Sequence, residues 1–382
     1  MSEDRTAPRS AGPETEELEF ADSDLIGENP EEDDTPQIRR RMRFPSARKR
    51  PSENETSTPE TGGEQPEGAS LHERFIEMLY RRRYDVERLI HPSLRRRLDV
   101  ANDFVWDNPN QRVVTYMGHK GGVGKTAVND AQATYTAHEL KGRAILLVDV
   151  NEGGGSTAYR LGIKRSDTML LPIYVGRRNE INTYEKMEPI VAKVRETGLM
   201  VIASARTVKP IHSLNRGEME HALEVLDTCS HSMYIDPGNP IMFYTNITAA
   251  RFADVVGFVC IHGDEESYDT AMDDRDDYRE EDDIMGKLET SPLVVLGGKE
   301  KNRKEYAERC GWSEEHVFVI PYDYHMAKRQ FGIIRYSRFR LRTRVALAEL
   351  KVFELKHSKK HEIDDSGTLF LQTKPAPVSA DT

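Results

Sequence analysis

The chain has 382 residues, of which 37% are hydrophobic and 31% are charged, and its formal net charge at pH 7 is -11. This length accommodates one large domain or two ordinary ones with a sizeable core. The acidic balance excludes a protein that coats nucleic acid with its whole surface, although it leaves room for a local basic patch.

Residues 1–70 are rich in Pro, Ser, Thr, Glu and Gly and hold few side chains that could form a core, so we predict that they are disordered. An acidic stretch, ENPEEDDTP, is followed there by a basic block, RRRMRFPSARKRP. The block could contact DNA, anionic lipid or an acidic partner, or it could pair with its acidic neighbour. In residues 71–110, apolar side chains such as Phe75, Met78 and Leu79 recur at helical spacing, which predicts a helical lead-in to the main domain.

From residue 111 the pattern changes to continuous apolar runs separated by helical stretches. Such runs are typical of strands buried on both faces, and their alternation with helices predicts a mainly parallel sheet in a three-layer α/β domain that extends to residue 357. Ligands of such sheets bind at the carboxyl ends of the strands. Residues 358–382 are expected to form a polar tail. The runs are VVTYM (113–117), AILLVDV (144–150), LMVIAS (199–204), SMYID (232–236), VVGFVCIH (255–262), PLVVLG (292–297) and VFVIPY (317–322).

The segment YMGHKGGVGKTAV, residues 116–128, places a glycine-rich turn between a strand and a helix, which is the context of a phosphate-binding loop. Its backbone N–H groups can converge on phosphate oxygens at the helix N-terminus. Lys125 is placed to reach the β- and γ-phosphates, and the Thr126 hydroxyl to bind Mg²⁺. The strict pattern requires glycine where His119 stands, and Lys120 adds a second lysine. The loop residues predicted to bind the nucleotide are Gly121, Gly122, Val123, Gly124, Lys125, Thr126 and Ala127.

The variant KGGVGKT resembles the deviant Walker A motif of the ParA/MinD family of ATPases. Three further segments follow in the family's order. AILLVDVNEGGGSTAYRLG is similar to its second strand and switch region, SMYIDPGNP to its Walker B segment, and VFVIPYDYHMAKR to its late strand and the loop near the adenine. The resemblance covers most of residues 112–355. It implies a P-loop NTPase fold, ATP and Mg²⁺ as cofactors, ATP hydrolysis and an ATP-dependent homodimer.

The same resemblance assigns roles to single residues. Lys120 is expected to reach the partner's phosphates across a nucleotide-sandwich dimer. Thr126, Asp149 and Asp236 are expected to hold Mg²⁺, directly or through water. The residues assigned to catalysis are Lys120, Lys125, Asp149 and Asn151, and those assigned to nucleotide binding beside the late strand are Pro321, Tyr322 and Asp323.

Two segments depart from the family pattern, one at Asn151 and one at Gly297 and Gly298. Asn151 stands where the family usually has a second aspartate that orients the attacking water. An amide can hydrogen-bond water but cannot accept its proton, so we predict slow hydrolysis, although phosphoryl transfer depends more on positioning and charge than on a base. Gly297 and Gly298 stand where relatives often carry an asparagine that reads adenine. The preference for ATP is therefore inferred from the resemblance alone.

A second candidate site is the basic stretch KRQFGIIRYSRFRLRTRVALAEL, residues 328–350. Phosphate contacts from such side chains give sequence-independent, salt-sensitive affinity for DNA. The ParA resemblance also implies DNA binding near the C-terminal helices. The alternative is a solvated helix face that pairs with the acidic residues 264–283. The candidate DNA-binding residues are Arg335, Arg338, Arg340, Arg342 and Arg344.

Several features exclude other partners and compartments. The three cysteines are odd in number and far apart, which disfavours disulfides, zinc and a metal-cluster carrier and is typical of the reducing cytosol. The N-terminus lacks an export signal, and no apolar run reaches the roughly 20 residues of a membrane span. Membrane attachment through a C-terminal helix is disfavoured, because Leu347, Leu350 and Phe353 form a narrow stripe typical of a helix packed on its own domain. We therefore predict a soluble, cytoplasmic protein.

The leading prediction is an ATP-binding, slowly hydrolysing ParA/MinD-like ATPase that dimerises on ATP. It would act as a positioning or partition switch for plasmid or chromosomal DNA, through non-specific DNA binding and a partner protein that stimulates hydrolysis. The alternative is a nucleotide-dependent scaffold or regulator of a secretion or conjugation machine with little or no hydrolysis, which Asn151 and the long N-terminal segment suggest.

Overall fold

The computed structural model describes residues 71–108, 112–118, 120–151, 155–204, 215–238, 244–327 and 333–357. The predictions made for residues 1–70 and 358–382, for His119 and for residues 328–332 of the basic stretch lie outside these ranges.

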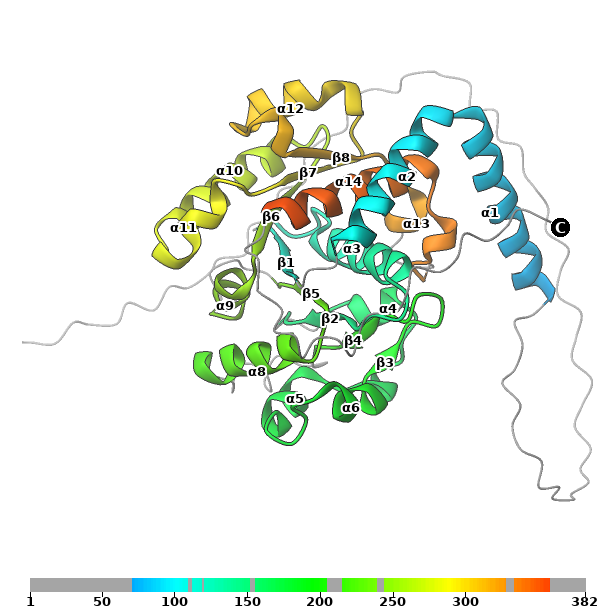
Figure 1. Ribbon diagram of the computed structural model, residues 1–382. Helices are drawn as coiled ribbons and strands as arrows, with labels where there is room; N and C mark the ends of the chain where they lie inside the picture. Colours follow the sequence, from blue (N-terminus) through cyan, green and yellow to red (C-terminus); the bar gives the residue numbers. More distant parts are fainter. Residues whose placement is uncertain are drawn as a thin grey trace, which may run out of the picture. The chain divides into compact units, whose positions relative to one another are not determined.

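One sheet of eight strands organises the described residues, in the order β3-β4-β2-β5-β1-β6-β7-β8 (Figure 1). All neighbouring strands pair in parallel except β3, which is antiparallel to β4. The seven predicted apolar runs all contain strands. The sequence did not predict β3, because two residues form no apolar run. The strands are β1 Arg112–Met117, β2 Ile145–Asp149, β3 Ala192–Lys193, β4 Met200–Ile202, β5 Ser232–Asp236, β6 Val255–Ile261, β7 Leu293–Leu296 and β8 Val317–Ile320.

Helices cover both faces of this sheet, which makes the three layers expected from the sequence (Figure 1). The α-helices are α1 Leu71–Ile90, α2 Pro92–Asp107, α3 Lys125–Glu139, α4 Thr157–Arg160, α5 Leu171–Arg177, α6 Tyr184–Met187, α8 Arg216–Thr228, α9 Tyr244–Phe252, α10 Glu265–Arg279, α11 Asp282–Leu288, α12 Arg303–Cys310, α13 Tyr324–Ala327 and α14 Leu341–His357. Short 3₁₀ helices are η1 Arg165–Asp167, η2 Glu188–Ile190, η3 Glu300–Asn302, η4 Glu314–His316 and η5 Tyr336–Arg338.

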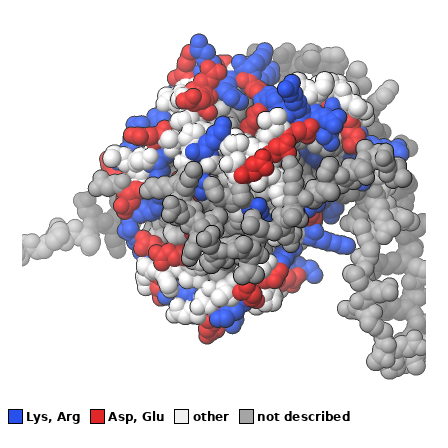
Figure 2. Space-filling view, in the orientation of Figure 1, with Lys and Arg blue, Asp and Glu red and all other residues white. Residues whose placement is uncertain are grey.

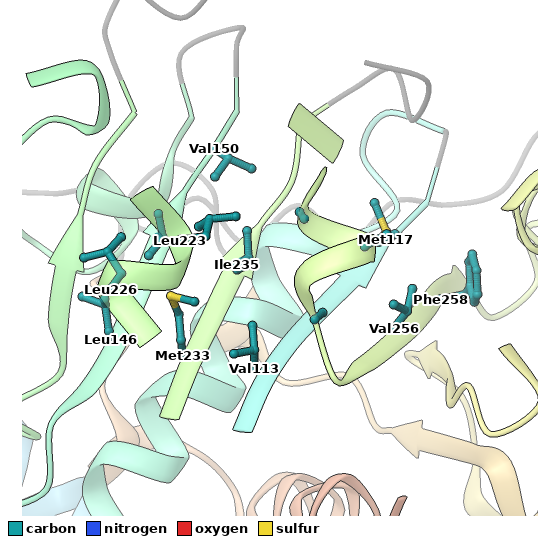
Figure 3. Packing of buried hydrophobic residues seen from close by; sticks show 14 of the residues in the cluster. Val113, Met117, Leu146, Val150, Leu223, Leu226, Met233, Ile235, Val256 and Phe258 are labelled. Carbon is teal, nitrogen blue, oxygen red and sulfur yellow. The ribbon is translucent and has the colours of Figure 1, made fainter. Parts of the chain in front are cut away.

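The core lies on both faces of the sheet because alternate side chains of each strand point to opposite sides. On β1, Val113 and Met117 join the cluster beneath α8, α9 and α10, whereas Val114 and Tyr116 join the cluster beneath α3 and α14. Figure 3 shows the first cluster, in which Val113 lies among side chains of β5 and its neighbours. Burial on two faces explains why these strands are continuously apolar in sequence.

The C-terminal helix α14 is surrounded by protein. Leu347 and Leu350 are fully buried, and α2 covers the helix with Leu98, Ala101 and Val105. The stripe that the sequence placed on this helix therefore packs on its own domain, as predicted. None of the described helices combines the length and apolarity needed to cross a membrane.

Charge is distributed without a dominant sign over the face shown in Figure 2, where Lys and Arg side chains alternate with Asp and Glu.

Candidate functional site

Three strands bring the predicted phosphate loop and its carboxylates to one edge of the sheet. β1 leads into the glycine-rich loop, β2 ends at Asp149 and β5 ends at Asp236. Because β2 and β5 are parallel neighbours in the register Asp149 to Asp236, the two carboxylates lie side by side. Both side chains are fully buried. The order of the strands in the sheet thus brings together two carboxylates that are 87 residues apart in the sequence, from Asp149 to Asp236.

The loop requires glycine at two positions. Gly122 and Gly124 have φ angles of 88° and 100°, which side chains rarely adopt. A Cβ atom on Gly124 would also lie 2.4 Å from Leu296 Cδ1. Since Gly124 is the N-cap of α3, it offers no side chain to occupy the first N–H groups of the helix, which are thereby left for an anion. Lys125 follows, almost buried, and its Nζ donates to the Lys120 carbonyl oxygen at 3.1 Å.

A cavity of about 760 Å³ opens beside this loop. Residues 122–127 line it, together with Asn151, Arg160, Gly297 and Tyr322. Its volume is within the range of about 300–1,000 Å³ that is usual for small-molecule sites. The loop backbone, a lysine and a wide cavity fit a nucleoside triphosphate.

Asp236 is the carboxylate best placed to share a cation with the loop. Burial raises its pKa to about 6, while hydrogen bonds from the hydroxyls of Thr157 and Thr126 and the charge of Lys125 lower it. Within the described ranges, no group of three or more His, Cys, Asp or Glu side chains could form a metal centre by itself. The donors present therefore fit Mg²⁺ held by Thr126, Asp236, water and phosphate oxygens, which is how this ion is usually bound.

Asp149 and Asn151 contact each other and pack closely against neighbouring glycines. Asp149 Oδ1 accepts a hydrogen bond from the Asn151 backbone N–H at 3.1 Å. A Cβ atom on Gly155 would lie 2.0 Å from Asp149 Oδ2, so this segment can approach the carboxylate only with glycine there. Asn151 lines the cavity. A Cβ atom added to Gly238 would lie 2.8 Å from the Asn151 Oδ1, so the amide packs closely against this glycine. Asn151 thus lines the candidate nucleotide cavity, and its role in catalysis stays a prediction.

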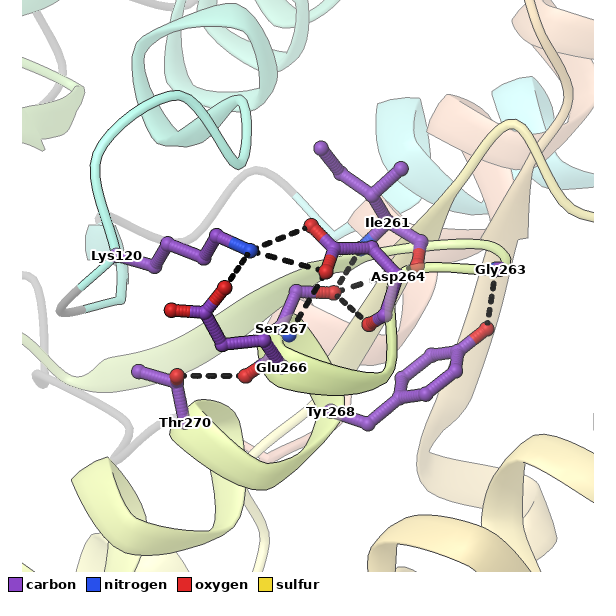
Figure 4. Close-up of polar contacts among 8 residues, drawn as sticks. All are labelled: Lys120, Ile261, Gly263, Asp264, Glu266, Ser267, Tyr268 and Thr270. Atoms are coloured by element: carbon purple, nitrogen blue, oxygen red, sulfur yellow. Dashed lines mark hydrogen bonds and ion pairs between the residues drawn. The ribbon is translucent and has the colours of Figure 1, made fainter. Parts of the chain in front are cut away.

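Lys120 is not among the side chains that line the cavity. Its Nζ forms ion pairs with Asp264 at 2.9 Å and Glu266 at 2.8 Å, at the start of α10 (Figure 4). Hydrogen bonds to Glu266 and Asp264 raise the pKa of Lys120, and the lysine lowers the pKa of Asp264. In a single chain, the lysine predicted to reach a partner is held by acidic side chains of its own chain.

Sequence reasoning missed a buried ion pair at the wall of the cavity. Arg160 Nε lies 2.6 Å from Asp130 Oδ2, and its Nη2 donates to the Met326 carbonyl oxygen at 2.9 Å. Burial raises the pKa of Asp130 to about 7, although the charge of Arg160 opposes this shift. Arg160 therefore joins the phosphate-loop helix to α13. No local pattern could reveal a pair of residues 30 positions apart.

The structure places the three predicted nucleotide-binding residues after β8 in different surroundings. Tyr322 lines the cavity and is largely exposed. Pro321 lines a neighbouring cavity instead. Asp323 is buried, and its Oδ2 accepts hydrogen bonds from the Arg340 N–H at 2.9 Å and the Thr343 hydroxyl at 2.8 Å. The carboxylate of Asp323 thus holds the start of α14 and does not line the cavity, and its contact with the nucleotide stays a prediction.

The predicted DNA-binding arginines do not form one exposed row. Only Arg340 and Arg342 have exposed side chains. Arg344 is 6% exposed and stacks on Tyr84 with its guanidinium carbon 3.7 Å from the ring centroid, so it cannot contact DNA without unpacking α1. In the acidic segment 264–283, Asp264 pairs with Lys120, Glu265 and Asp269 pair with Arg309, and Asp276 pairs with Arg279. The two partly exposed arginines are Arg335 and Arg338.

Comparison with solved structures supports the fold. The chain is similar to a ParA family ATPase from Chlorobium tepidum TLS, with a TM-score of 0.50 and 16% identity, over 57% of this chain and 88% of that one. It is also similar to the septum site-determining protein MinD complexed with Mg-ADP from Pyrococcus horikoshii OT3, with a TM-score of 0.47 and 14% identity, over 62% and 94% of the two chains. No family model and no curated protein matches the sequence. The similarity to the ParA family structure confirms the predicted ParA/MinD-like fold.

Proposed function

We propose that this protein is an ATPase that binds ATP with Mg²⁺ in the cavity beside the phosphate loop. The observation that carries this proposal is a cavity lined by Lys125, Thr126 and two glycines with left-handed φ angles, with the buried Asp236 hydrogen-bonded to Thr126 behind its wall. Bound Mg²⁺ would neutralise phosphate charge, while the loop N–H groups and Lys125 would orient the phosphates. The burial of both carboxylates supports a site from which water is largely excluded.

The nucleotide site is tested by the affinity for ATP in the presence of Mg²⁺. Lys125→Ala is expected to weaken binding about 10- to 100-fold, because hydrogen bonds to charged groups contribute about 1.5–3 kcal/mol. Lys141→Ala is the matched control, since Lys141 is exposed just after the same helix. Equal affinity of the two variants would show that the phosphates are bound elsewhere.

We propose that hydrolysis is slow because Asn151 can orient water without accepting its proton. The measurement is phosphate release by the wild type and by Asn151→Asp, which introduces a base of nearly the same size. General-base catalysis contributes about 10²–10⁴-fold where it operates, so a clear increase is expected for Asn151→Asp. A decrease would show that the amide itself is the better group. If the wild type bound ATP but released no phosphate, the second candidate, a nucleotide-dependent scaffold, would be favoured.

Dimerisation on ATP is proposed to use Lys120. Its ion pairs with Asp264 and Glu266 are partly exposed, so they can be exchanged for phosphate oxygens of a second copy at low cost. ATP needs only to bind the dimer better than the monomer to shift the equilibrium. The molar mass in solution, with ADP and with ATP, tests this step. Lys120→Ala is expected to remain monomeric with ATP while it still binds the nucleotide.

We propose a positioning or partition role in which the dimer contacts non-specific DNA and a partner protein that stimulates hydrolysis. Of the predicted DNA surface, the exposed Arg340 and Arg342 remain as candidates. Neutralising both is expected to lower the slope of log affinity against log salt by about 0.9 per lost phosphate contact. A double variant of exposed residues elsewhere, Arg177→Gln with Lys186→Gln, is the control. Equal salt slopes for the two double variants would exclude this surface.

A further inference from the structure

A second cavity, of about 470 Å³, lies where the helical lead-in meets the sheet domain. α2 forms one wall with Leu94 and Arg97, η3 and the start of α12 form another, and β8 and α14 form the floor with Phe318 and Val345. α2 precedes the part of the sequence that resembles ParA/MinD ATPases. The cavity therefore exists only because this chain's own lead-in packs on the domain.

The charge of the lining is strongly unbalanced. Five cationic side chains and two carboxylates line the cavity, an excess of three positive charges in a chain whose net charge is -11. A concave site with an excess of one sign concentrates ligands of the opposite sign. The cations are Arg97, Lys299, Lys301, Arg303 and Arg342, and the carboxylates are Glu300 and Glu349.

Arg97 already occupies both carboxylates. It binds Glu349 through Nε at 2.8 Å and Nη2 at 2.9 Å, and Glu300 through Nη2 at 2.6 Å. These contacts raise the pKa of Arg97 further and lower that of Glu300. In the part of the chain that the structure describes, no carboxylate lies within ion-pair distance of Lys299, Lys301 or Arg342. The excess charge of the cavity thus comes from side chains that are available to a ligand.

The floor of the cavity is apolar and aromatic. Phe318 lies there beside Pro321, and the Arg303 guanidinium carbon is 6.0 Å from the Phe318 ring centroid. A cationic rim over such a floor suits a ligand with phosphate groups at one end and a flat ring at the other. We propose that this cavity is a second binding site, for a phosphorylated small molecule with a flat ring, such as a nucleotide.

Only two short backbone segments separate this site from the first cavity. Gly297 lines the first cavity and Gly298 the second, and Tyr322 lines the first while Pro321 lines the second. A Cβ atom on Gly298 would lie 2.9 Å from Tyr306 Oη and 3.0 Å from Val319 Cγ1, so a side chain there would require Tyr306 or Val319 to shift. A ligand in the second cavity would therefore press on backbone that also borders the first.

The test uses the full chain carrying Lys125→Ala, which removes a phosphate contact from the first cavity, and inorganic pyrophosphate as the probe in a calorimetric titration. One binding site is expected to remain. Adding Lys299→Glu and Lys301→Glu, both exposed and outside the core, should weaken it at least about tenfold, because each change replaces an attraction by a repulsion. The control adds Lys141→Glu and Lys304→Glu, which change the net charge equally at exposed positions outside both cavities and should leave the affinity unchanged.

Two results would overturn the proposal: absence of pyrophosphate binding in the Lys125→Ala protein, or binding that the Lys299 and Lys301 changes do not weaken more than the control changes. ADP is expected to bind this site more tightly than pyrophosphate because its adenine ring can pack on Phe318. Equal affinities would contradict the proposal that the ligand carries a flat ring. The proposal is independent of the first site. Failure of the nucleotide-site test, in which Lys125→Ala leaves ATP affinity unchanged, would not alter the response of pyrophosphate binding to Lys299 and Lys301.

Discussion

Two sets of ion pairs flank the phosphate loop, and they differ in exposure. Lys120 and its partners Asp264 and Glu266 lie at the surface, with Glu266 77% exposed. Arg160 and Asp130 are 6% and 0% exposed. Water and salt compete for the first set, so its net stabilisation is small and the lysine can change partners. The second pair cannot be broken without leaving a buried charge, so it fixes the geometry of the cavity wall.

The largest expected effect is on the buried pair. Arg160→Met is expected to destabilise the protein by about 3–5 kcal/mol, because it leaves Asp130 buried without its partner. Urea unfolding monitored by circular dichroism measures this loss. Replacing both residues, with Arg160→Met and Asp130→Leu, should recover much of it, since no charge then remains buried. If Arg160→Met alone were as stable as the wild type, the ion pair would not stabilise the fold.

The pH dependence of the same pair is expected to be the next largest effect. The pKa of Asp130 is raised to about 7 in the folded chain, above the value of about 3.8 for an unperturbed aspartate. Its contribution to stability is therefore fully present below pH 3.8 and is lost as the pH rises through 7. Relative to Asp130→Asn, which cannot titrate, the wild type should gain about 2 kcal/mol between pH 7 and pH 5. Urea midpoints of both proteins at pH 5, 6 and 7 measure it, and a gain in the opposite direction would contradict the assigned shift.

The smallest expected effect is on the exposed pairs. Asp264→Asn with Glu266→Gln frees Lys120, so ATP-dependent dimerisation should become about threefold tighter while stability hardly changes. The dimer dissociation constant with ATP, from sedimentation, measures this change. The matched control is Asp269→Asn with Glu265→Gln. These two carboxylates lie on α10, as Glu266 does, but they pair with Arg309 of α12 and not with Lys120. A double variant that dimerised less than this control would show that the acidic side chains support the dimer interface.

The phosphate loop and the two strand-end aspartates could be predicted because their signals are local. A turn that needs a left-handed φ is recognised by its glycine, and a strand that ends at a carboxylate is recognised by an apolar run followed by Asp. Asp323 also follows an apolar run, but a local pattern could not predict where its carboxylate binds. The carboxylate accepts a hydrogen bond from the N–H of Arg340, 17 residues further along the chain and just before α14.

The sequence by itself determined the α/β class, the order of the strands along the chain and the place of the glycine-rich loop between strand and helix, because periodicity and glycine placement are properties of short segments. Only the tertiary structure decided which charges meet. Lys120 meets Asp264 across 144 residues, and Arg97 meets Glu349 across 252. It also decided that Arg344 is buried and that α2 closes a second cavity. Such contacts depend on how separate helices and strands pack. The residue pattern of one segment does not indicate which other segments will lie beside it.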